Sequence, residues 1–342
     1  MSPFDAGEKV TLSVTELFDL ARHVLVGAGL APAHADAVAR VITACERDEC
    51  ASHGLYRLPG CVTTIRSGRL SHDAEPTIAD MSPALVRADA HRAYSLLAFE
   101  RAMPVLVKKA KSAGVAALAI NHCFHFSALW PEIEALTQQG VAALAVTPSH
   151  AWVAPAGGTK GLLGTNPIAF GWPRPGAHPY VFDFATSAIA RGDLALHDIA
   201  GKPLPEGCGV NANGNPTTDA RAVQDGAMLT FGGYKGSALA TMIELMAGPL
   251  IGDLTSRESM DFDAGDKLAP LHGELILAFD PAILGGGDAG AHAARAEAFL
   301  SAFADQGARL PSQRRYEARA RSLAQGVRVA RPLYDRIMDL GY

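Results

Sequence analysis

The sequence predicts an α/β fold with a separate helical unit, and three observations indicate this. Gly114–Ile120 reads GVAALAI and Gly140–Val146 reads GVAALAV, and each segment follows a predicted helix. Apolar residues before position 75 instead recur with the helical period. The chain has 342 residues and 49% hydrophobic residues, which is enough apolar material for more than one core.

The first 75 residues are predicted to form three helices. Ser13 and Glu16 have the spacing of a capping box, and a helix with an apolar face follows them. Pro32 suits the first position of a second helix, which is expected to run to about residue 49. A third helix is expected over 58–66, before Gly68.

The rest of the chain alternates between the two periods. A strand at 84–89, a helix at 94–112 and a helix at 131–139 surround the two GVAALA segments, and we expect these segments to be neighbouring strands. Further strands are expected at 167–172, 179–184 and 274–279, and a helix from about 234. Two C-terminal helices are expected to pack on the N-terminal ones. This packing gives a discontinuous helical domain, 1–75 plus about 292–342, and an α/β domain over about 76–291.

Composition excludes several classes of protein. The formal net charge is −5 and no basic stripe is present, so neither nucleic acid nor an anionic membrane is an expected partner. Five cysteines occur without a C-x-x-C pair, which favours reduced thiols in the cytoplasm. The N-terminal ten residues lack the features of a signal peptide. The most apolar helix, about 237–250, carries Glu244 and is too short to cross a bilayer.

Several motifs could carry chemistry, each with a plainer interpretation beside it. Gly285–Gly290 matches G-x-G-x-x-G, but no second βαβ half follows, so we interpret it as a loop before a helix. His122 and His125 could bind zinc with His150, or they could belong to a ligand-binding loop at a strand end. Lys160 lies among glycines, where a backbone can approach a ligand.

Two more motifs lie further along the chain. Asp183 stands where an apolar strand ends, and Thr186 and Ser187 are expected to open a helix, for which capping is the plain interpretation. The stretch that begins Gly232-Gly-Tyr-Lys feeds a glycine-rich turn into a helix N-terminus, where a phosphate can bind. Its plain interpretation is the start of an ordinary core helix.

The order of the motifs is more specific than any one of them. Ser-His-Gly-x-x-Arg at 52–57 is followed by Asn-x-x-x-His-Phe at 121–126 and Gly-Thr-Asn-Pro-x-Ala at 164–169. Asp-x-Ala-Thr-Ser at 183–187 and Gly-Tyr-Lys-Gly at 233–236 complete the series. Over about residues 10–330 the chain resembles the non-Rossmann malate/L-lactate dehydrogenase family, and within it the bacterial Δ1-piperideine-2-carboxylate/Δ1-pyrroline-2-carboxylate reductases.

The resemblance implies a non-Rossmann cofactor domain with its own mixed β-sheet, a helical domain built from both chain ends, and a homodimer. The implied acid site is Ser52 and His53, with Asp183 or Asp193 as the relay carboxylate and Asp183 preferred. Substrate would be held by Arg57, Lys160, Thr186 and Ser187. The cofactor would be held by Asn121, His122, Cys123, Phe124, His125, His178, Pro179, Tyr180, Leu229, Thr230, Asp305, Gly307 and Arg309.

The implied reaction is reduction of the C=N bond of a cyclic imino acid, without a metal. His53 would supply the proton and Arg57 would bind the substrate carboxylate as a bidentate fork. The cofactor is expected to be NADPH, because no Rossmann-type acidic residue is placed for a ribose 2′-hydroxyl, whereas His122, His178 and Arg309 could meet a phosphate. The alternatives are an NAD-dependent 2-hydroxyacid dehydrogenase, a zinc hydrolase, and a non-catalytic binding protein. His53 could also be an ordinary helix-end histidine.

Overall fold

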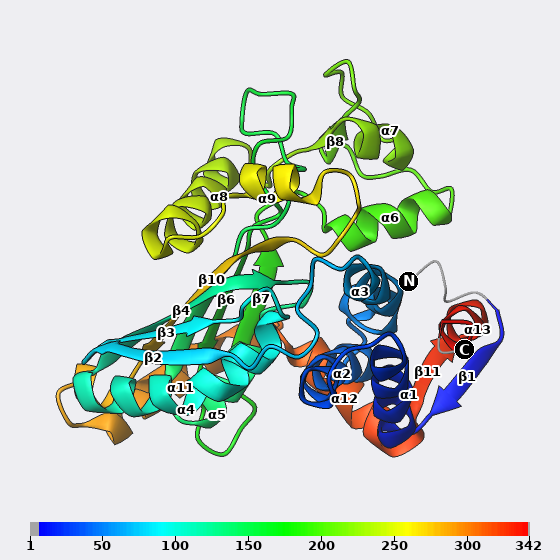
Figure 1. Ribbon diagram of the computed structural model, residues 1–342. Helices are drawn as coiled ribbons and strands as arrows, with labels where there is room; N and C mark the ends of the chain where they lie inside the picture. Colours follow the sequence, from blue (N-terminus) through cyan, green and yellow to red (C-terminus); the bar gives the residue numbers. More distant parts are fainter. Residues whose placement is uncertain (1–6, 341–342) are drawn as a thin grey trace.

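The computed structural model describes residues 7–340 and shows a mixed α/β protein (Figure 1). Residues 1–6, which belong to the stretch that argued against a signal peptide, lie outside the described part. The central sheet has seven strands in the order β2-β3-β4-β10-β5-β6-β7. Their bounds are Thr77–Ser82, Leu85–Asp89, Val115–Phe124, Leu271–Phe279, Ala142–Val146, Pro167–Trp172 and Tyr180–Ala185. Only β3 and β4 pair in parallel, so the predicted mixed sheet is confirmed.

Alternate residues of the central strands face two different layers of helices. In β4, Leu118 and Ile120 pack with α4 (Ser95–Ala113) and α5 (Trp130–Gln138), while Ala119 packs with α8 (Tyr234–Ala247). A strand covered on both faces needs apolar side chains of both parities, because successive side chains point to opposite faces. This requirement explains why the GVAALA segments show no polar alternation.

The expectation that the two GVAALA strands are neighbours is wrong. They form β4 and β5, but β10 lies between them and is antiparallel to both. The nine-residue β10 comes more than a hundred residues later in the chain, so local sequence repetition could not reveal its insertion. The strands β1 (Lys9–Leu12), β2 and β11 (Val327–Ala330) were also not predicted.

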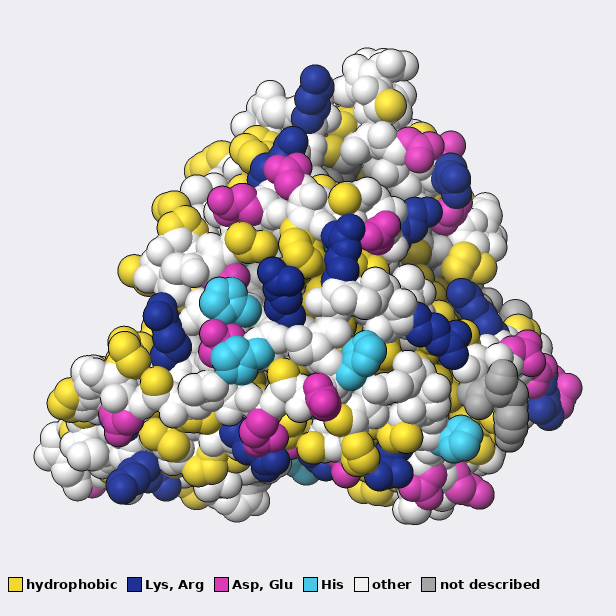
Figure 2. Space-filling view, in the orientation of Figure 1, with side chains coloured by type: hydrophobic (Ala, Val, Ile, Leu, Met, Phe, Trp, Pro, Cys, Tyr) yellow, Lys and Arg dark blue, Asp and Glu magenta, His cyan; other side chains and the backbone are white. Residues whose placement is uncertain are grey.

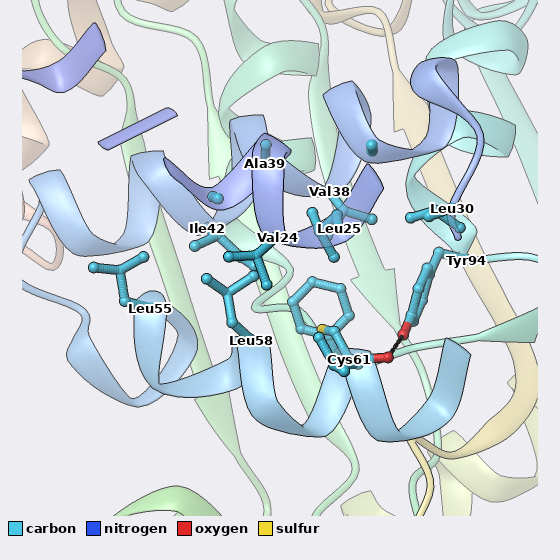
Figure 3. Packing of buried hydrophobic residues seen from close by; sticks show 14 of the residues in the cluster. Val24, Leu25, Leu30, Val38, Ala39, Ile42, Leu55, Leu58, Cys61 and Tyr94 are labelled. Atoms are coloured by element: carbon cyan, nitrogen blue, oxygen red, sulfur yellow. Dashed lines mark hydrogen bonds between the residues drawn. The ribbon is translucent and has the colours of Figure 1, made fainter. Parts of the chain in front are cut away.

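Both ends of the chain share one core in the helical part. The helices α1 (Val14–Gly27), α2 (Pro32–Arg47) and α3 (Leu58–Arg66) pack with α13 (Arg331–Met338), and β1 pairs with β11. Figure 3 shows Val24, Leu25, Val38 and Ile42 meeting Leu58 in this core. Here the hydroxyl of Tyr94, from the turn before α4, donates to the Cys61 carbonyl at 3.1 Å. The predicted capping box of Ser13 and Glu16 is present at the start of α1.

The remaining segments form smaller elements around the central sheet and the helical part. The helices α6 (Arg191–Ile199) and α7 (Ala220–Asp225) and the strands β8 (Gly209–Val210) and β9 (Ala227–Met228) surround a third small core (Figure 1). The helix α9 spans Ser256–Asp263, and one-turn helices lie at Ala51–His53 (η2), Leu55–Arg57 (η3) and Pro249–Ile251 (η4). Within 7–340 no single helix is long and apolar enough to span a membrane; α8 and α9 together meet the criterion only as a pair bent by 73°.

Near the C-terminus, the interpretation of Gly285–Gly290 as a loop is confirmed. The glycines join α10 (Pro281–Leu284) to α11 (Ala289–Asp305), and Gly286 and Gly287 have positive φ. The predicted domain boundary near 292 falls inside α11. This helix is tied to the β6–β7 loop by the ion pair of Arg174 with Glu297, at 2.8 Å. The helix α12 (Gln313–Gln325) packs against α2.

A buried acid beside the helical core makes stability depend on pH. Burial raises the pKa of Glu46 from 4.5 to about 7, although its carboxylate accepts the Leu55 N–H at 2.8 Å. Because the folded-state pKa is the higher one, this group's stabilisation is complete below the unfolded pKa and is lost as pH rises from about 4.5 to about 7.

We therefore expect Glu46→Gln to flatten the pH dependence of stability. Between about pH 5 and about pH 8, wild type should lose on the order of 2 kcal/mol of unfolding free energy relative to the variant. Urea unfolding of both proteins at the two pH values measures the difference. A difference that stays constant with pH would show that Glu46 is ionised in the folded protein throughout.

Candidate active site

The Ser52-His53 pair lies on a tight turn whose backbone is held by a hydrogen bond to the Glu46 side chain. The turn consists of η2 and η3, which follow the C-terminus of α2. A Cβ atom at Gly54 would lie 2.0 Å from Glu46 Oε2, which accepts the Leu55 N–H. Glycine at position 54 is therefore required by this close approach.

His53 is half-buried, and its neighbours disfavour a positive charge on it. Its Nδ1 lies 3.1 Å from Ser52 Oγ, so the predicted contact between the two side chains is present. Burial, the positive charge of Arg57 and the nearby His125 lower the pKa of His53 well below its ordinary value. In the absence of an anion, His53 is therefore neutral at pH 7.

Arg57 has a guanidinium group without an ion pair in the described chain. Its Nε atom is buried and has no hydrogen-bond partner among residues 7–340. Burial lowers the pKa of Arg57, and Asp193 and Tyr56 act in the opposite direction. Arg57 is half-buried, and a buried donor such as its Nε is costly without a partner, so this group is suited to binding an anion.

The N-terminus of α6 packs against the turn that carries Ser52 and His53. A Cβ atom at Gly192 would approach Ser52 Cβ to 3.0 Å, so α6 packs directly on the turn. Arg191 was not predicted from the sequence. Its Cζ lies 4.8 Å from the centroid of the Trp152 ring, and its charge interacts with the Tyr56 hydroxyl. Asp193 is solvent-accessible, and partial burial raises its pKa while His197 and Arg57 lower it. Asp193 was predicted as an alternative relay carboxylate, and its closeness to Arg191 in the sequence was the signal that could have indicated Arg191 as well.

Asp183 occupies a different place from the one that a relay to His53 requires. Its Oδ2 accepts the N–H groups of Leu129 and Trp130, at 2.8 and 3.0 Å, at the start of α5. Burial raises its pKa to about 6, against the effect of these two donors and of Arg315. No hydrogen bond joins Asp183 to His53 among the described residues. The preference for Asp183 as the relay therefore has no contact to support it.

The expectation that Thr186 and Ser187 open a helix is wrong. The helix α6 begins at Arg191, with Ala190 as its N-cap. The Thr186 N–H donates to the Thr165 carbonyl, its hydroxyl bonds the Thr165 and Asn166 carbonyls, and Ser187 forms a bridge to Thr230. These bonds continue the β6–β7 pairing beyond the strand ends. The fully buried Thr186 hydroxyl is thus already satisfied internally, and Ser187 Oγ donates to the Ile189 carbonyl.

The predicted cofactor segment 121–125 divides into buried and accessible residues. Cys123 and Phe124 have no exposed surface, and the Cys123 thiol donates to the His272 carbonyl. Asn121 is also buried and bonds Asp253, whereas His122 is exposed and contacts Asp89 at 3.0 Å. Further along, the buried atoms His125 Nε2, Ser127 Oγ and Trp130 Nε1 have no hydrogen-bond partner in the described part of the chain.

The remaining predicted cofactor residues form a separate group at the start of β7. His178 stacks on Tyr316 with ring centroids 4.2 Å apart, and the Tyr316 hydroxyl donates to the Pro179 carbonyl. Ser312 donates to the Val181 carbonyl, next to Tyr180. Asp305, Gly307 and Arg309 are exposed in the turn between α11 and α12. This turn therefore lies beside the start of β7.

Two further predicted segments lie on the side of α8. Leu229 is half-buried and Thr230 is buried, and the Thr230 hydroxyl donates to the Gly233 carbonyl just before α8. Lys160 is exposed, and within 7–340 no ion pair holds it. On the face shown in Figure 2, basic and acidic side chains alternate and histidines gather near the middle.

The predicted zinc alternative is not formed by this structure. His122 faces Asp89, His125 faces Glu274, and His150 contacts the Leu268 carbonyl, so the three histidines have three different partners. Within residues 7–340, the side chains with metal-ligand spacing are instead His125, Glu132 and Glu274. Sequence reasoning missed both acids, although a glutamate in the apolar strand 271–279 was a usable signal.

Known proteins are similar in sequence to this chain over nearly its whole length. A model of the malate/L-lactate dehydrogenase family matches residues 12–338. The Δ1-pyrroline-2-carboxylate reductase 2 of Burkholderia multivorans is 57% identical over 338 residues, 99% of this chain and 98% of that protein. The Δ1-pyrroline-2-carboxylate/Δ1-piperideine-2-carboxylate reductase of Pseudomonas aeruginosa is 56% identical over 97% of this chain and 99% of that protein.

Solved structures agree with the sequence comparison. The crystal structure of Δ1-piperideine-2-carboxylate reductase from Pseudomonas syringae pv. tomato superposes with a TM-score of 0.92 and 41% identity. It covers 97% of this chain and 99% of that one. The arrangement of sheet and helices described above is therefore the one found in that enzyme.

The contacts of Asp183 predict a stability effect. Asp183→Ala should leave two N–H groups of α5 without an acceptor and lower the unfolding free energy by about 1–3 kcal/mol. Asp183→Asn keeps an acceptor oxygen and should cost less. Urea denaturation of the three proteins tests this, and equal stability of Asp183→Ala and wild type would remove Asp183 as the cap.

Proposed function

The chain belongs to the malate/L-lactate dehydrogenase family, and from this premise we propose that it reduces cyclic imino acids. The proposed substrates are Δ1-pyrroline-2-carboxylate, reduced to L-proline, and Δ1-piperideine-2-carboxylate, reduced to L-pipecolate. The reductases of Burkholderia multivorans and Pseudomonas aeruginosa support this choice, because they match this chain at 57% and 56% identity over nearly its whole length.

The observation that carries the proposal is the unpaired guanidinium of Arg57 beside His53. A 2-carboxylate substrate supplies the anion that Arg57 lacks, and guanidinium binds carboxylates through two parallel N–H···O bonds. His53 and Arg57 lie on the consecutive one-turn helices η2 and η3. Together they would hold a small molecule by its carboxylate and place its C=N nitrogen at a proton donor.

A nicotinamide cofactor supplies the hydride in this family of dehydrogenases. The residues of the chain fit such a group: Ser127 Oγ and Trp130 Nε1 are buried polar atoms that lack partners within the described residues. Exposed His122 lies near this segment, and His178 lies at the start of β7. Exposed Arg309 precedes Ser312, which donates to the Val181 carbonyl of β7. The segment 125–130 would then hold one part of the cofactor and the His178–Arg309 region another.

The proton at nitrogen is proposed to come from His53. Hydride addition to the carbon of C=N places the electrons of the π bond on nitrogen, and a protonated imidazole can donate its proton to that nitrogen and become neutral. Free His53 is neutral because Arg57 and burial lower its pKa. A bound carboxylate offsets the Arg57 charge and so raises the pKa of His53. Charging of the donor is thereby tied to the presence of substrate.

We propose Asp193 as the relay carboxylate, because Asp183 is already engaged elsewhere and Asp193 lies beside the turn that carries Ser52 and His53. It lies on the first turn of α6, one residue after Gly192, which contacts Ser52, and its charge interacts with Arg57. Asp183 is engaged with the N-terminus of α5. We therefore assign the orientation of the Ser52–His53 pair to Asp193 and the capping of α5 to Asp183. Asp193 therefore takes the role for which the sequence favoured Asp183.

The proposal includes the division of the chain into a helical domain from both ends and an α/β cofactor domain, with the active site between them. It also includes a homodimer. The helix α8 carries exposed apolar side chains, Tyr234 and Leu245 among them, along a groove of about 710 Å³. A second copy of the chain is the occupant that we propose for this face.

A steady-state substrate panel tests the function. It compares the two cyclic imines with pyruvate, oxaloacetate and ureidoglycolate, each with NADPH and with NADH. We expect the highest kcat/KM for a cyclic imine. Higher values for a keto or hydroxy acid would support the alternative, an NAD-dependent 2-hydroxyacid dehydrogenase.

The donor role of His53 predicts the effect of its removal. His53→Ala should lower kcat by about 10²–10⁴-fold while cofactor affinity changes little. Asp193→Asn should also lower kcat, whereas Asp183→Asn should not. Stopped-flow turnover and cofactor titration of each variant provide the data. Near-normal turnover by His53→Ala would exclude it as the donor.

The charge near β7 predicts preference for NADPH over NADH. Arg309 is exposed, has no ion pair in the described chain, and lies within about 11 Å of Ser312 along the backbone. A charged contact to a 2′-phosphate contributes about 1.5–3 kcal/mol, so a preference of about tenfold or more is expected. It should shrink in Arg309→Ala and His178→Ala and persist in Arg66→Ala, a surface control. Equal kcat/KM for both cofactors in wild type would refute the preference.

The apolar face of α8 predicts the effect of a charge on assembly. Leu245 is 59% exposed, and Leu245→Glu should convert the dimer to a folded monomer. Leu323→Glu, at the 63% exposed leucine of α12, is the matched control and should stay dimeric. Light scattering gives the mass and circular dichroism the fold. A dimeric Leu245→Glu protein would place the interface elsewhere.

A further inference from the structure

Three buried side chains, His125, Glu132 and Glu274, meet at one point of the fold, and the proposed function gives the two glutamates no role. His125 follows β4, Glu132 lies in the first turn of α5, and Glu274 lies on β10. They are 5%, 2% and 0% exposed, and their ligand-type atoms all lie within 4.8 Å of one another. They come from three elements, so the tertiary fold has to bring them together.

The two glutamates face each other without a cation. No Lys or Arg of residues 7–340 pairs with Glu132 or Glu274, and none of their four carboxyl oxygens has a donor among those residues. Two buried carboxylates in contact cannot both be ionised at low cost, so one proton is shared between them. That proton turns the contact into a hydrogen bond. Burial raises the pKa of both acids, and the charge of Glu274 raises that of Glu132 further. The pKa of Glu274 rises to about 7, because burial and the charge of Asp183 outweigh the hydrogen bond with Glu132, which lowers it.

The Glu274 carboxyl group also faces His125. Glu274 Oε2 lies 3.6 Å from His125 Nε2, which has no other partner in the described chain. The register irregularity of β10 between His272 and Glu274 occurs at this point and redirects the side chain. Burial and Arg57 lower the pKa of His125 to about 4, so the ring is neutral.

We propose that Glu132 and Glu274 form a shared-proton pair that sets the tautomer of His125, and through it the environment of His53. With Glu274 ionised, its carboxylate accepts a hydrogen bond from His125 Nε2–H, and Nδ1 is the free acceptor. With Glu274 protonated, its O–H donates to Nε2, and the proton of His125 moves to Nδ1. The three are positioning residues, and their role in turnover rests on the proposed function.

The partners of this group restrict what else could titrate in its place. Glu274 is faced by Glu132 from α5 and Asp183 from β7, and His125 is faced by His272 from β10 and Arg57 from η3. The thiol of Cys123 on β4 also lies near both acids and stays protonated, since burial raises its pKa. A tautomer change near neutral pH is therefore expected to follow Glu274 rather than His272, whose pKa is lowered by burial.

The direct test does not need turnover. Infrared spectra of the cofactor-free protein should show a buried protonated carboxyl group above about pH 8, lost in Glu132→Gln. Nitrogen NMR of the histidine rings should show His125 protonated at Nε2 above about pH 7 and at Nδ1 below it, without this change in Glu274→Gln. Absence of the carboxyl band, or a His125 tautomer that is the same in both pH ranges, would overturn the proposal.

Kinetics test the consequence for the reaction. Glu274→Leu removes the acceptor and should lower kcat about tenfold or more with an unchanged KM for cofactor. In wild type, kcat is expected to fall below about pH 7, where Glu274 becomes protonated. Glu274→Gln keeps an acceptor and cannot titrate, so it should retain most of kcat at high pH and show no such fall. The surface variant Glu100→Gln is the control.

The outcomes separate the two proposals. Wild type that is inactive on every cyclic imine would refute the proposed function, while the infrared and NMR results would still decide the tautomer proposal. Equal effects of Gln and Leu at position 274, with an unchanged pH profile, would show only a packing role. Stoichiometric zinc in the purified protein, absent from Glu274→Leu, would mean that the three residues are metal ligands and would overturn the proposal.

Discussion

The positive charge of Arg57, which has no ion pair within the described residues, is the constraint on which the candidate active site depends. Its buried Nε lacks a partner, and after burial, the larger cause, its positive charge lowers the pKa of both His53 and His125. A site arranged in this way is incomplete without an anion. Substrate carboxylate would supply that anion and would at the same time make protonation of His53 favourable, so binding and acid catalysis share one interaction.

The fold holds this charge in place through elements from distant parts of the sequence. Glu46 on α2 fixes the turn that carries His53 and Arg57, through the Leu55 N–H and the close approach to Gly54. The start of α6 packs against Ser52. Asp183 holds the start of α5, which carries Glu132 toward Glu274. The turn that carries His53 and Arg57 thus lies between the helical core and the sheet. Motion of either part would change the positions of these two side chains.

The sequence predicted most elements because their signals are local. The capping box at Ser13, the proline at the start of α2 and the apolar pattern of each strand are each contained in a few consecutive residues. The position of β10 between β4 and β5 was missed because strand order is set by tertiary pairing. The short strands β1 and β11 were missed because each is stabilised only by pairing across the whole chain.

The site shows the same division. The proximity of Ser52 to His53, and of both to Arg57, follows from adjacency in sequence and was predicted. The roles of Asp183, Thr186, Cys123 and Phe124 depend on which way their side chains face, which no local pattern specifies. Glu274 alone could have been noticed as a glutamate in an apolar strand, but its pairing with Glu132 could not be foreseen, because tertiary folding brings the two distant positions together.

The most direct test of this account is the pKa of His53 measured by NMR with and without a bound carboxylate. Pyrrole-2-carboxylate, a planar analogue of the cyclic imine, can serve as the anion. The account predicts a His53 pKa well below the ordinary value of about 6.5 in the free protein, and a rise when the analogue binds. In Arg57→Gln the free-protein value should already be higher and should respond less. An ordinary pKa in the free wild-type protein, unchanged by the analogue, would contradict the coupling of Arg57 to His53.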